Sequence, residues 1–408
     1  MGLNDTVSSE RIHIGFFGLR NAGKSSVVNA VTGQQLAVVS DVMGTTTDPV
    51  KKAMELLPLG PVVVTDTAGI DDEGALGQKR VEKTYEVLAK TDIAVLVADA
   101  VRGKQKEDTE LIALFEKRGL PYVVALNKCD LLENLPDVSE NEIYVSAKTG
   151  VNINELKEKI GALAKNKGKP KHIVSDLLSA GDTVVLVIPI DESAPKGRLI
   201  LPQQMTIRDI VENNAIAVSC RDTELENTLF ALSKKPNLVI TDSQVFGKVS
   251  KIVSEDVPLT SFSILMARFK GELSVLTEGA AKLNEIKNGD TVLISEGCTH
   301  HRQCNDIGTV KIPQWIREYT GNEPNFVFTS GGEFPKDLSD VTLVVHCGGC
   351  MLNEKEMKHR LALCKEYGVP TVNYGIAVAQ MKGILKRSLE VFRKPKRSEC
   401  ERENSFVS

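Results

Sequence analysis

The sequence lacks a hydrophobic run long enough to cross a membrane. Its longest apolar runs, such as residues 183–188, fall far short of the roughly 20 residues that span a bilayer. Residues 1–11 are polar and contain no apolar segment of the kind that a signal peptide needs. We therefore expect a cytoplasmic protein without a membrane partner.

A strong excess of charge of one sign is also missing. The 408 residues include 50 Lys and Arg against 54 Asp and Glu, which gives a formal net charge of −4. Proteins that coat nucleic acid usually carry a basic excess, so we expect no nucleic-acid partner.

Internal repeats and low-complexity tracts are absent as well, and hydrophobic residues make up 42% of the chain. This composition is ordinary for globular domains, and it excludes a disordered chain and a collagen-like fibre. At roughly 150 residues per domain, the length predicts two to four domains.

Eight cysteines are present, and they are unevenly distributed. In a chain without an export signal, we do not expect them to form a disulfide framework. Four of them lie between positions 298 and 350, and two of these four form a CxxC. Some can be small hydrophobic core residues, but the clustering indicates metal, cluster or redox chemistry.

Strands and helices alternate in three segments of the chain, which predicts βαβ units and parallel sheets. The first segment has predicted strands at 11–18, 61–66, 93–99 and 122–127 and predicted helices at 23–32, 81–90, 107–118 and 154–164, the last capped by Asn154. The second has predicted strands at 183–190 and 238–241 and a helix at 203–213. The third has predicted strands at 291–295, 326–329, 341–345 and 371–374 and helices at 354–367 and 378–392. The basic run 165–171 contains Gly and Pro but no apolar residue, so it predicts a linker after the first segment.

A phosphate-binding loop follows the first predicted strand. Residues 18–25 read G-L-R-N-A-G-K-S, which fits G-x-x-x-x-G-K-[ST] between a strand and a helix. Backbone N–H groups of such a loop point at phosphate oxygens, and the helix adds its positive dipole end. Lys24 supplies a charge for the β- and γ-phosphates, and the Ser25 hydroxyl is a ligand for Mg²⁺. The other expected nucleotide-binding residues of this loop are Gly18, Asn21, Ala22, Gly23 and Ser26.

A second motif, Asp-Thr-Ala-Gly, closes the next predicted strand. Asp66 lies where a carboxylate holds Mg²⁺ through water, and Gly69 can offer its N–H to a γ-phosphate and release it after hydrolysis.

Two further motifs select the base. Asn127, Lys128 and Asp130 end another strand, and the Asp130 carboxylate can accept hydrogen bonds from the N1–H and amino group of guanine, which favours GTP over ATP. A later motif is expected to support the bound base, and its residues are Ser146, Ala147 and Lys148. Four motifs in this order, each at a strand end, predict a GTP site.

The order of these motifs resembles the TrmE–Era group of small GTPases over residues 10–165. Residues 44–48, G-T-T-T-D, are similar to the first switch loop of that group, G-T-T-R-D, with Thr47 in place of the arginine. The resemblance implies that Thr46 coordinates Mg²⁺ and belongs with Lys24, Asp66 and Gly69 to the catalytic set. It also implies that Asn21 holds a potassium ion near the phosphates, as its counterpart does in some of these GTPases.

Position 70 is Ile70 rather than a glutamine that could orient water. We therefore expect slow intrinsic GTP hydrolysis. Help is expected from K⁺, from a partner, or from a switch carboxylate, for which the candidates are Asp71, Asp72 and Glu73.

A second constellation lies in the third segment, where Cys298 and the CxxC of Cys347 and Cys350 follow two predicted strands. The glycines between Cys347 and Cys350 let the loop curl and direct N–H groups at sulfur. Three thiolates suit both tetrahedral Zn²⁺ and a [4Fe–4S] cluster. A zinc site would close with a histidine, whereas a cubane would leave one iron for an exchangeable ligand. The candidates for that fourth position are His300, His346 and Glu296.

The remaining cysteines and histidines carry weaker expectations. Cys304 is either a spare thiol or a fourth ligand, and His301 is expected to be a structural neighbour. No chemical role is expected for Cys129, Cys220, Cys364, Cys400, His13, His172 and His359.

The pattern Cys-x-His, 45 residues, His-Cys-x-x-Cys, behind the GTPase motifs, is similar to the HydF family of [FeFe]-hydrogenase maturation GTPases. The resemblance covers essentially the whole chain. It implies that Cys298, Cys347 and Cys350 bind a [4Fe–4S] cluster and that His300 and His346 match the two family histidines.

The same resemblance implies a fold class and a set of partners. The fold would be α/β, with a P-loop GTPase domain at 1–168, a dimerisation domain at 172–265, a Rossmann-like cluster-binding domain at 266–395 and a disordered tail at 396–408. The protein would be a homodimeric scaffold whose cluster helps to hold a diiron precursor with CO and CN⁻ ligands. Radical-SAM enzymes would build this precursor, the scaffold would hand it to apo-hydrogenase, and the GTPase would gate partner exchange.

Two other functions remain open at the level of sequence. One is a TrmE–Era-like GTPase in RNA modification or ribosome assembly with a structural zinc, which predicts a basic face or an RNA-binding fold after the linker. The other is a metal or redox sensor with a purely structural GTP site, which fits poorly with the intact phosphate loop.

Overall fold

The computed structural model describes residues 10–34, 50–57, 59–67, 75–165, 171–190, 199–298 and 306–393. Several predicted features lie outside these residues: Thr46 and its switch loop, Gly69, the carboxylates at 71–73, His300, His301, Cys304, Cys400, most of the linker, and the tail. The chain divides into two compact units, Met1–Lys169 and Pro170–Ser408.

The first unit is built on a six-stranded sheet in the order β2-β3-β1-β4-β5-β6. The strands are β1 (Ile12–Phe17), β2 (Val50–Leu56), β3 (Gly60–Asp66), β4 (Ile93–Asp99), β5 (Tyr122–Asn127) and β6 (Glu142–Tyr144). The helices are α1 (Lys24–Thr32), α2 (Ala75–Lys90), α3 (Lys106–Lys117) and α4 (Ile153–Lys165). All strand pairs are parallel except the pair of β2 with β3.

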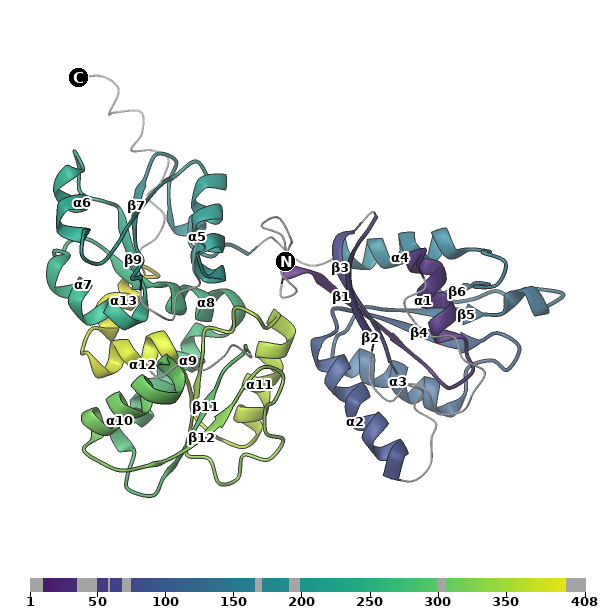
Figure 1. Cartoon of the computed structure of the whole chain (residues 1–408). Coiled ribbons are helices and arrows are strands. Elements are labelled where there is room, and N and C mark those ends of the chain that lie inside the picture. The colour runs from purple at the N-terminus through teal and green to yellow at the C-terminus, as the bar shows by residue number, and fades with distance from the viewer. Residues whose placement is uncertain are drawn as a thin grey trace. The chain divides into compact units, whose positions relative to one another are not determined.

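Helices cover both faces of this sheet (Figure 1). Val95 and Val97 of β4 pack in the core under α1 and α4, whereas Ala94 and Leu96 pack in the core under α2 and α3. Because alternate residues of a strand point to opposite faces, a strand buried on both faces needs a continuous apolar run. This need explains why β4 is a continuous apolar run.

The sequence prediction for this unit missed the edge strand β2 and misplaced a helix cap. The antiparallel strand β2 was not predicted, because its side chains are mostly exposed and polar and give no apolar run. Asn154 is not a helix cap, because α4 begins one residue earlier, at Ile153, and Asn154 lies in its first turn.

The second unit contains two four-stranded parallel sheets, in the orders β10-β9-β7-β8 and β12-β11-β13-β14. The elements of the first are β7 (Thr183–Val187), α5 (Leu201–Glu212), β8 (Ile216–Cys220), α6 (Leu225–Ala231), β9 (Leu238–Thr241), α7 (Phe246–Ile252), β10 (Leu259–Ser261) and α8 (Phe262–Lys270). The elements of the second are α9 (Leu273–Gly279), β11 (Thr291–Ser295), α10 (Ile312–Thr320), β12 (Asn325–Thr329), β13 (Leu343–His346), α11 (Glu354–Glu366), β14 (Thr371–Asn373), α12 (Tyr374–Met381) and α13 (Leu385–Glu390).

One continuous hydrophobic core joins the two sheets of this unit. It contains Val187 and Val239 from the first sheet together with Ile294 and Val345 from the second, all fully buried. The predicted border between two domains at residue 265 falls inside α8. The division at that border stays a prediction.

The helix predicted over 378–392 is wrong, because two helices occupy this stretch. α12 ends at Met381, and α13 starts at Leu385. Gly383 between them has a φ of +71°, a left-handed conformation that glycine adopts without strain and that ends a helix.

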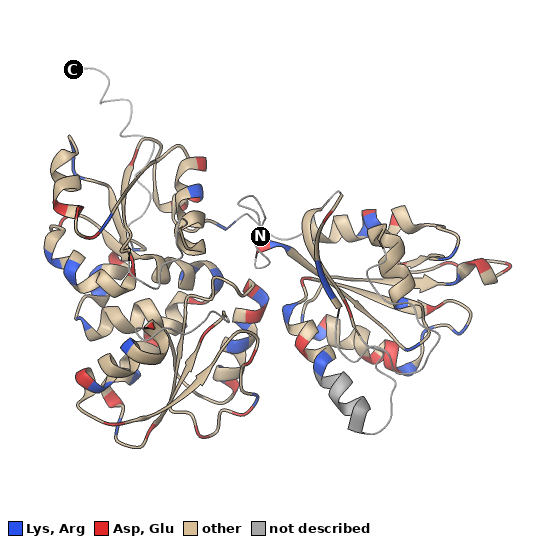
Figure 2. Ribbon diagram, in the orientation of Figure 1, with Lys and Arg blue, Asp and Glu red and all other residues tan. Residues whose placement is uncertain are grey.

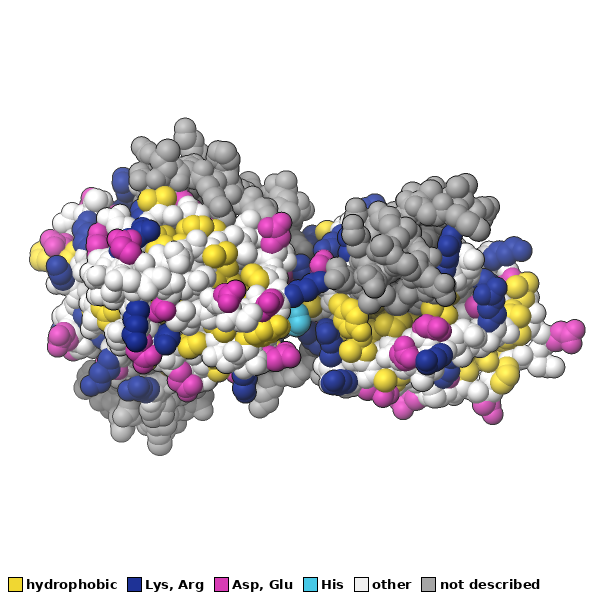
Figure 3. Space-filling view, turned by 90° about the horizontal axis from the view of Figure 1, so that it is seen from below, with side chains coloured by type: hydrophobic (Ala, Val, Ile, Leu, Met, Phe, Trp, Pro, Cys, Tyr) yellow, Lys and Arg dark blue, Asp and Glu magenta, His cyan; other side chains and the backbone are white. Residues whose placement is uncertain are grey.

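Charged residues of both signs are interspersed along the elements of both units (Figure 2). On the face that Figure 3 shows, apolar side chains form small groups among them. Within the part of the chain that the structure describes, no helix is both long and apolar enough to span a membrane.

Candidate nucleotide site and candidate cysteine centre

The loop between β1 and α1 depends on two glycines. Gly18 has a φ of +137°, and a Cβ there would lie 2.2 Å from the carbonyl oxygen of Val97. Gly23 has a φ of +87°, and a Cβ there would lie 2.3 Å from Nδ2 of Asn127. Both positions therefore require glycine, for backbone conformation and for space.

Lys24 is buried at the start of α1, and its ammonium lies inside the loop. Its Nζ donates hydrogen bonds to the carbonyl oxygens of Gly18 and Leu19, both at 2.8 Å. The loop thus holds a positive charge next to the N-terminus of α1, where an anion is favoured.

Ser25 and Asp66 form the polar pair that suits Mg²⁺. Ser25 Oγ donates a hydrogen bond of 2.7 Å to Asp66 Oδ2, while Asp66 Oδ1 is buried without a hydrogen-bond partner. Burial raises the pKa of Asp66, and the bond from Ser25 and the charge of Lys24 act against this rise. A hydroxyl and a buried carboxylate oxygen are hard oxygen ligands, so the pair fits a divalent cation.

Asn127, at the end of β5, connects the phosphate loop to the base-binding loops. Its Nδ2 donates to the carbonyl oxygen of Ala22 at 3.0 Å, and its Oδ1 accepts from the backbone N–H of Ala147 at 3.0 Å. The buried amide therefore sets the spacing between the two loops.

Lys128 reinforces the same connection. Its Nζ donates to the carbonyl oxygen of Asn21 at 2.7 Å and to Asp99 Oδ2 at 2.6 Å. Burial raises the pKa of Asp99, but the hydrogen bond and charge of Lys128 and the backbone N–H groups of Val101 and Arg102 together outweigh it, so this pKa is lowered overall. Asn21 and Lys128 both have a positive φ, of 61° and 68°.

Ser146 orients the carboxylate of Asp130. The fully buried Ser146 donates a hydrogen bond of 2.6 Å from its Oγ to Asp130 Oδ1, and it accepts one from the backbone N–H of Thr149. Asp130 and Lys148 are exposed, and Ser26 is half-buried in the first turn of α1. The structure thus brings together the described residues of the predicted GTP site.

The cysteine loop follows β13, and the strand next to it, β11, ends just before Cys298. Cys347 Sγ accepts hydrogen bonds from the backbone N–H groups of Gly297, at 3.0 Å, and Gly349, at 3.3 Å. Gly349 has a φ of +62°, and a Cβ there would lie 2.7 Å from the sulfur of Met357. Two loops from neighbouring strands therefore meet at one sulfur.

Burial controls the ionisation of these thiols in the metal-free protein. It raises the pKa of Cys347 to about 11, against the effect of the two backbone hydrogen bonds, and the charges of Cys350 and Glu296 raise it further. Burial also raises the pKa of Cys350, and the charge of Lys270 acts against it. Both thiols are therefore neutral near pH 7 until a soft metal displaces their protons.

The structure brings the predicted metal ligands together only in part. Among the residues that the structure describes, no three His, Cys, Asp or Glu side chains are arranged as a ready metal site. Cys298 is described, but residues 299–305 after it are not. Soft sulfur atoms, with backbone N–H groups that donate to one of them, fit a thiolate-bound metal. The identity of that metal stays a prediction.

Both ring nitrogens of the buried His346 are engaged. Its Nε2 lies 3.1 Å from the guanidinium of Arg360, and its Nδ1 lies 2.8 Å from the carbonyl oxygen of Cys347. Arginine only donates, so Nε2 accepts and Nδ1 carries the proton. In this arrangement neither nitrogen offers a lone pair to a metal.

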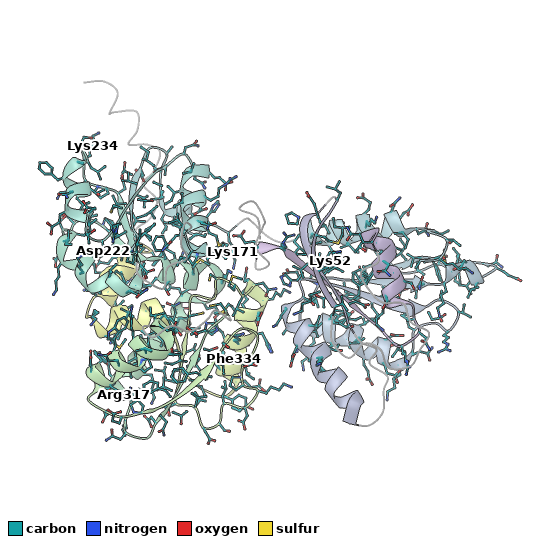
Figure 4. All side chains as sticks on the ribbon, in the orientation of Figure 1. Lys52, Lys171, Asp222, Lys234, Arg317 and Phe334 are labelled. Atoms are coloured by element: carbon teal, nitrogen blue, oxygen red, sulfur yellow. The ribbon has the colours of Figure 1, made fainter. Side chains whose placement is uncertain are left out.

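Arg360 of α11 is a residue that sequence reasoning missed. It is 2% exposed, and it donates to Ser295 Oγ at the end of β11, to the carbonyl oxygen of Gly331 and to Glu356. The ring of Phe334, labelled in Figure 4, lies 5.1 Å from its guanidinium carbon. This buried cation holds several strand ends around the cysteine loop.

Glu296 is buried beside the same loop. Its carboxylate accepts a hydrogen bond of 3.4 Å from the hydroxyl of Tyr374. Burial, followed by the charges of Cys347 and Glu296, raises the pKa of Tyr374 well above its ordinary value. Tyr374 is therefore a neutral hydrogen-bond donor at this site.

The environment of His346 leads to a pH prediction for the metal-free protein. Burial and the charge of Arg360 lower its pKa from 6.5 to about 4. Between these values the unfolded chain binds more protons, so stability is full above pH 6.5 and falls as the pH decreases toward 4. We expect the free energy of unfolding to drop by about 2 kcal/mol from pH 7 to pH 5.

Trp315, the single tryptophan, lies in α10 and reports on the second unit in urea titrations of the full chain. In His346→Gln the pH dependence should flatten, whereas in the exposed control His359→Gln it should persist. Equal pH dependence in wild type and His346→Gln would contradict this assignment.

Comparisons with known proteins match GTPase models in the N-terminal half of the chain and hydrogen maturase F models in the C-terminal half. The family model described as "50S ribosome-binding GTPase" matches residues 13–128, and that of the "Elongation factor Tu GTP binding domain" matches 78–194. The "Hydrogen maturase F dimerization domain" matches residues 173–271, and the "Hydrogen maturase F tetramerization domain" matches 274–391.

Similar curated proteins include GTPase Der of Kosmotoga olearia, 33% identical over 175 residues, which are 38% of this chain and 39% of that protein. The tRNA modification GTPase MnmE of Nitrosospira multiformis is 35% identical over 156 residues, 36% of this chain and 34% of that protein. The chain thus spans well under half the length of these relatives. Era of Aquifex aeolicus bound to GDP and AlF₄⁻ is 19% identical, with 51% of this chain and 92% of that chain covered and a TM-score of 0.34, which supports no conclusion here.

These findings confirm several predictions. The chain has an N-terminal P-loop GTPase domain, for which GTP and Mg²⁺ are the ligands, followed by further α/β segments. Its dimerization and tetramerization segments indicate that it self-associates. Because two segments specific to hydrogen maturase F stand directly behind a GTPase domain, this chain belongs to the HydF family of hydrogenase maturation GTPases.

Proposed function

We propose that this protein is a GTP-hydrolysing scaffold that binds a [4Fe–4S] cluster and a diiron precursor and delivers the precursor to apo-[FeFe]-hydrogenase. The observation that carries the proposal is the pair of backbone N–H groups aimed at Cys347 Sγ, in a segment specific to hydrogen maturase F. The partners are radical-SAM maturation enzymes and apo-hydrogenase, and the scaffold works as a homodimer or a larger assembly of such dimers in the cytoplasm.

GTP binding begins at the phosphate loop. The ammonium of Lys24, now on two loop carbonyls, moves to the β- and γ-phosphates, and Ser25 and Asp66 hold Mg²⁺. Asp130, oriented by Ser146, pairs with the guanine edge. Thr46 and Gly69 complete the site from their switch loops.

Hydrolysis by water yields GDP and phosphate. Asn21, which has an exposed side chain and a carbonyl oxygen held by Lys128, is where we place a potassium ion that assists this step. Loss of the γ-phosphate releases the switch loops and thereby changes an interface with a partner.

Cys298, Cys347 and Cys350 would hold the cluster, which would supply an open iron for an exchangeable ligand. The chain's own residues prepare the site: backbone N–H groups of Gly297 and Gly349 stabilise a thiolate at Cys347. Since both nitrogens of His346 are engaged, the fourth ligand is left to the other two candidates, His300 and Glu296.

Anaerobic reconstitution with iron and sulfide tests this function. We expect stoichiometric iron and sulfide, and an EPR signal of a cubane after chemical reduction. Stoichiometric zinc without a cubane signal would contradict the scaffold and support a TrmE–Era-like GTPase with a structural zinc instead. The wild-type chain is used throughout, so no variant can confuse the outcome.

A further inference from the structure

We propose that Lys270, the last residue of α8, is a positioning residue of the cysteine centre that fixes the CxxC loop and stabilises its negative charge. This inference rests on the proposed function, because it assigns a role toward the cluster held by that loop.

The ammonium of Lys270 binds the loop backbone at three points. Its Nζ donates to the carbonyl oxygens of Gly349 at 3.2 Å, Cys350 at 2.8 Å and Leu352 at 2.7 Å. These carbonyls span the second half of the CxxC and the residues just after it, so one side chain closes the loop.

The number of these hydrogen bonds fixes the charge of the group. An ammonium has three donors and no acceptor, whereas a neutral amine has fewer donors. Three carbonyl partners therefore indicate a positive charge, and Lys270 is only 3% exposed. A charge that is buried to this extent acts strongly on its neighbours, because water screens it little.

Both ends of α8 are anchored, so the position of this charge is set by the fold. Near its start, Ser263 Oγ donates to Asn373 Oδ1 and accepts from the backbone N–H of Gly375, each at 3.1 Å. Leu265 is fully buried in the core between them. The helix thus links the end of β14 to the cysteine loop through rigid contacts.

The sign of the charge matches the group that the loop would hold. A cubane bound by three thiolates is an anion, and one-electron reduction makes it more negative. A fixed cation beside the loop stabilises the reduced form more than the oxidised form, and cluster potentials respond to such charges. Lys270 should therefore raise the reduction potential of the cluster.

The test compares Lys270→Met and Lys270→Gln with wild type after reconstitution. At a solution potential fixed at the wild-type midpoint, the ratio of reduced to oxidised cluster in EPR should fall about tenfold, equivalent to about 59 mV for one electron. Lys282→Met is the matched control, since Lys282 pairs with Glu285 at the surface of the same unit, and its potential should stay unchanged.

A second readout uses the metal-free protein. Deuterium labelling of the backbone amides of the CxxC loop, followed by peptide mass spectrometry, should be about fivefold faster in the neutral variants, because the loop opens more often. In Lys270→Arg the charge is kept, but one nitrogen can no longer serve three carbonyls, so labelling should accelerate while the potential is retained.

The outcomes separate the two proposals. If the wild-type chain takes up no cubane, the proposed function fails. If it does, and the potential and the labelling rate of the neutral variants equal those of wild type, the role of Lys270 is overturned while the scaffold function stands. If neither neutral variant folds, unchanged labelling in Lys270→Arg overturns the positioning role.

Discussion

Replacing Lys24 by alanine should reduce GTP turnover roughly 10²- to 10³-fold or more and leave cluster uptake unchanged. The lysine is the positive charge that the phosphate loop holds, and its ammonium already lies against the loop carbonyls. Phosphate release measured with GTP in excess gives the first quantity. Iron and sulfide content after anaerobic reconstitution gives the second.

Lys106→Ala is the matched control, because this lysine of α3 is exposed and pairs only weakly with Glu110 across one helical turn. It should hydrolyse GTP like wild type. The two sites lie in different compact units, each with its own core, which is why we expect them to be separable. Loss of both GTP turnover and cluster uptake in Lys24→Ala would contradict that expectation.

Replacing Cys347 by serine should abolish activation of apo-hydrogenase and leave GTP turnover at the wild-type level. A serine hydroxyl is a hard ligand and a weak acid, so it does not replace a thiolate on iron. The two backbone N–H groups that now meet the Cys347 sulfur would face a hydroxyl oxygen instead of a soft thiolate. Activation is measured as hydrogen evolution after mixing with apo-hydrogenase and the radical-SAM maturation enzymes.

Cys364→Ser controls for the chemistry of the substitution itself. Cys364 is a buried thiol of α11 in the same unit, and it packs with Leu293 and Val344 in a cluster that includes no residue of the cysteine loop. The Cys364→Ser variant should load the cluster and activate hydrogenase, even where its stability is reduced. Full activation by the Cys347→Ser variant would rule out the role assigned to this residue.

The nucleotide site is the part of this protein that sequence predicts best. Its motifs are short, each is read from consecutive residues, and parallel strands bring their carboxyl ends to one edge of a sheet. Contacts such as Ser25 with Asp66, and Asn127 with Ala22, follow from that arrangement. The edge strand β2 has no such motif, and its mostly exposed side chains form no apolar pattern that would predict a strand.

The surroundings of the cysteine loop could not be predicted in the same way. The cysteines are visible as a pattern, but Lys270 contacts carbonyl groups about 80 positions away in sequence, and any residue type supplies a carbonyl. Arg360 likewise bonds Ser295, which is 65 positions away. Partners of this kind depend on how α8 and α11 dock, and packing is not encoded in local spacing.

The core that the two C-terminal sheets share limits which segments can be swapped between homologous proteins. A chimera with residues 173–271 from one homologue and 274–391 from another would join two halves of one packed interior whose side-chain volumes were never matched. We therefore expect the two segments to be exchangeable only as one block. The GTPase unit has a core of its own, so we expect it to be exchangeable separately.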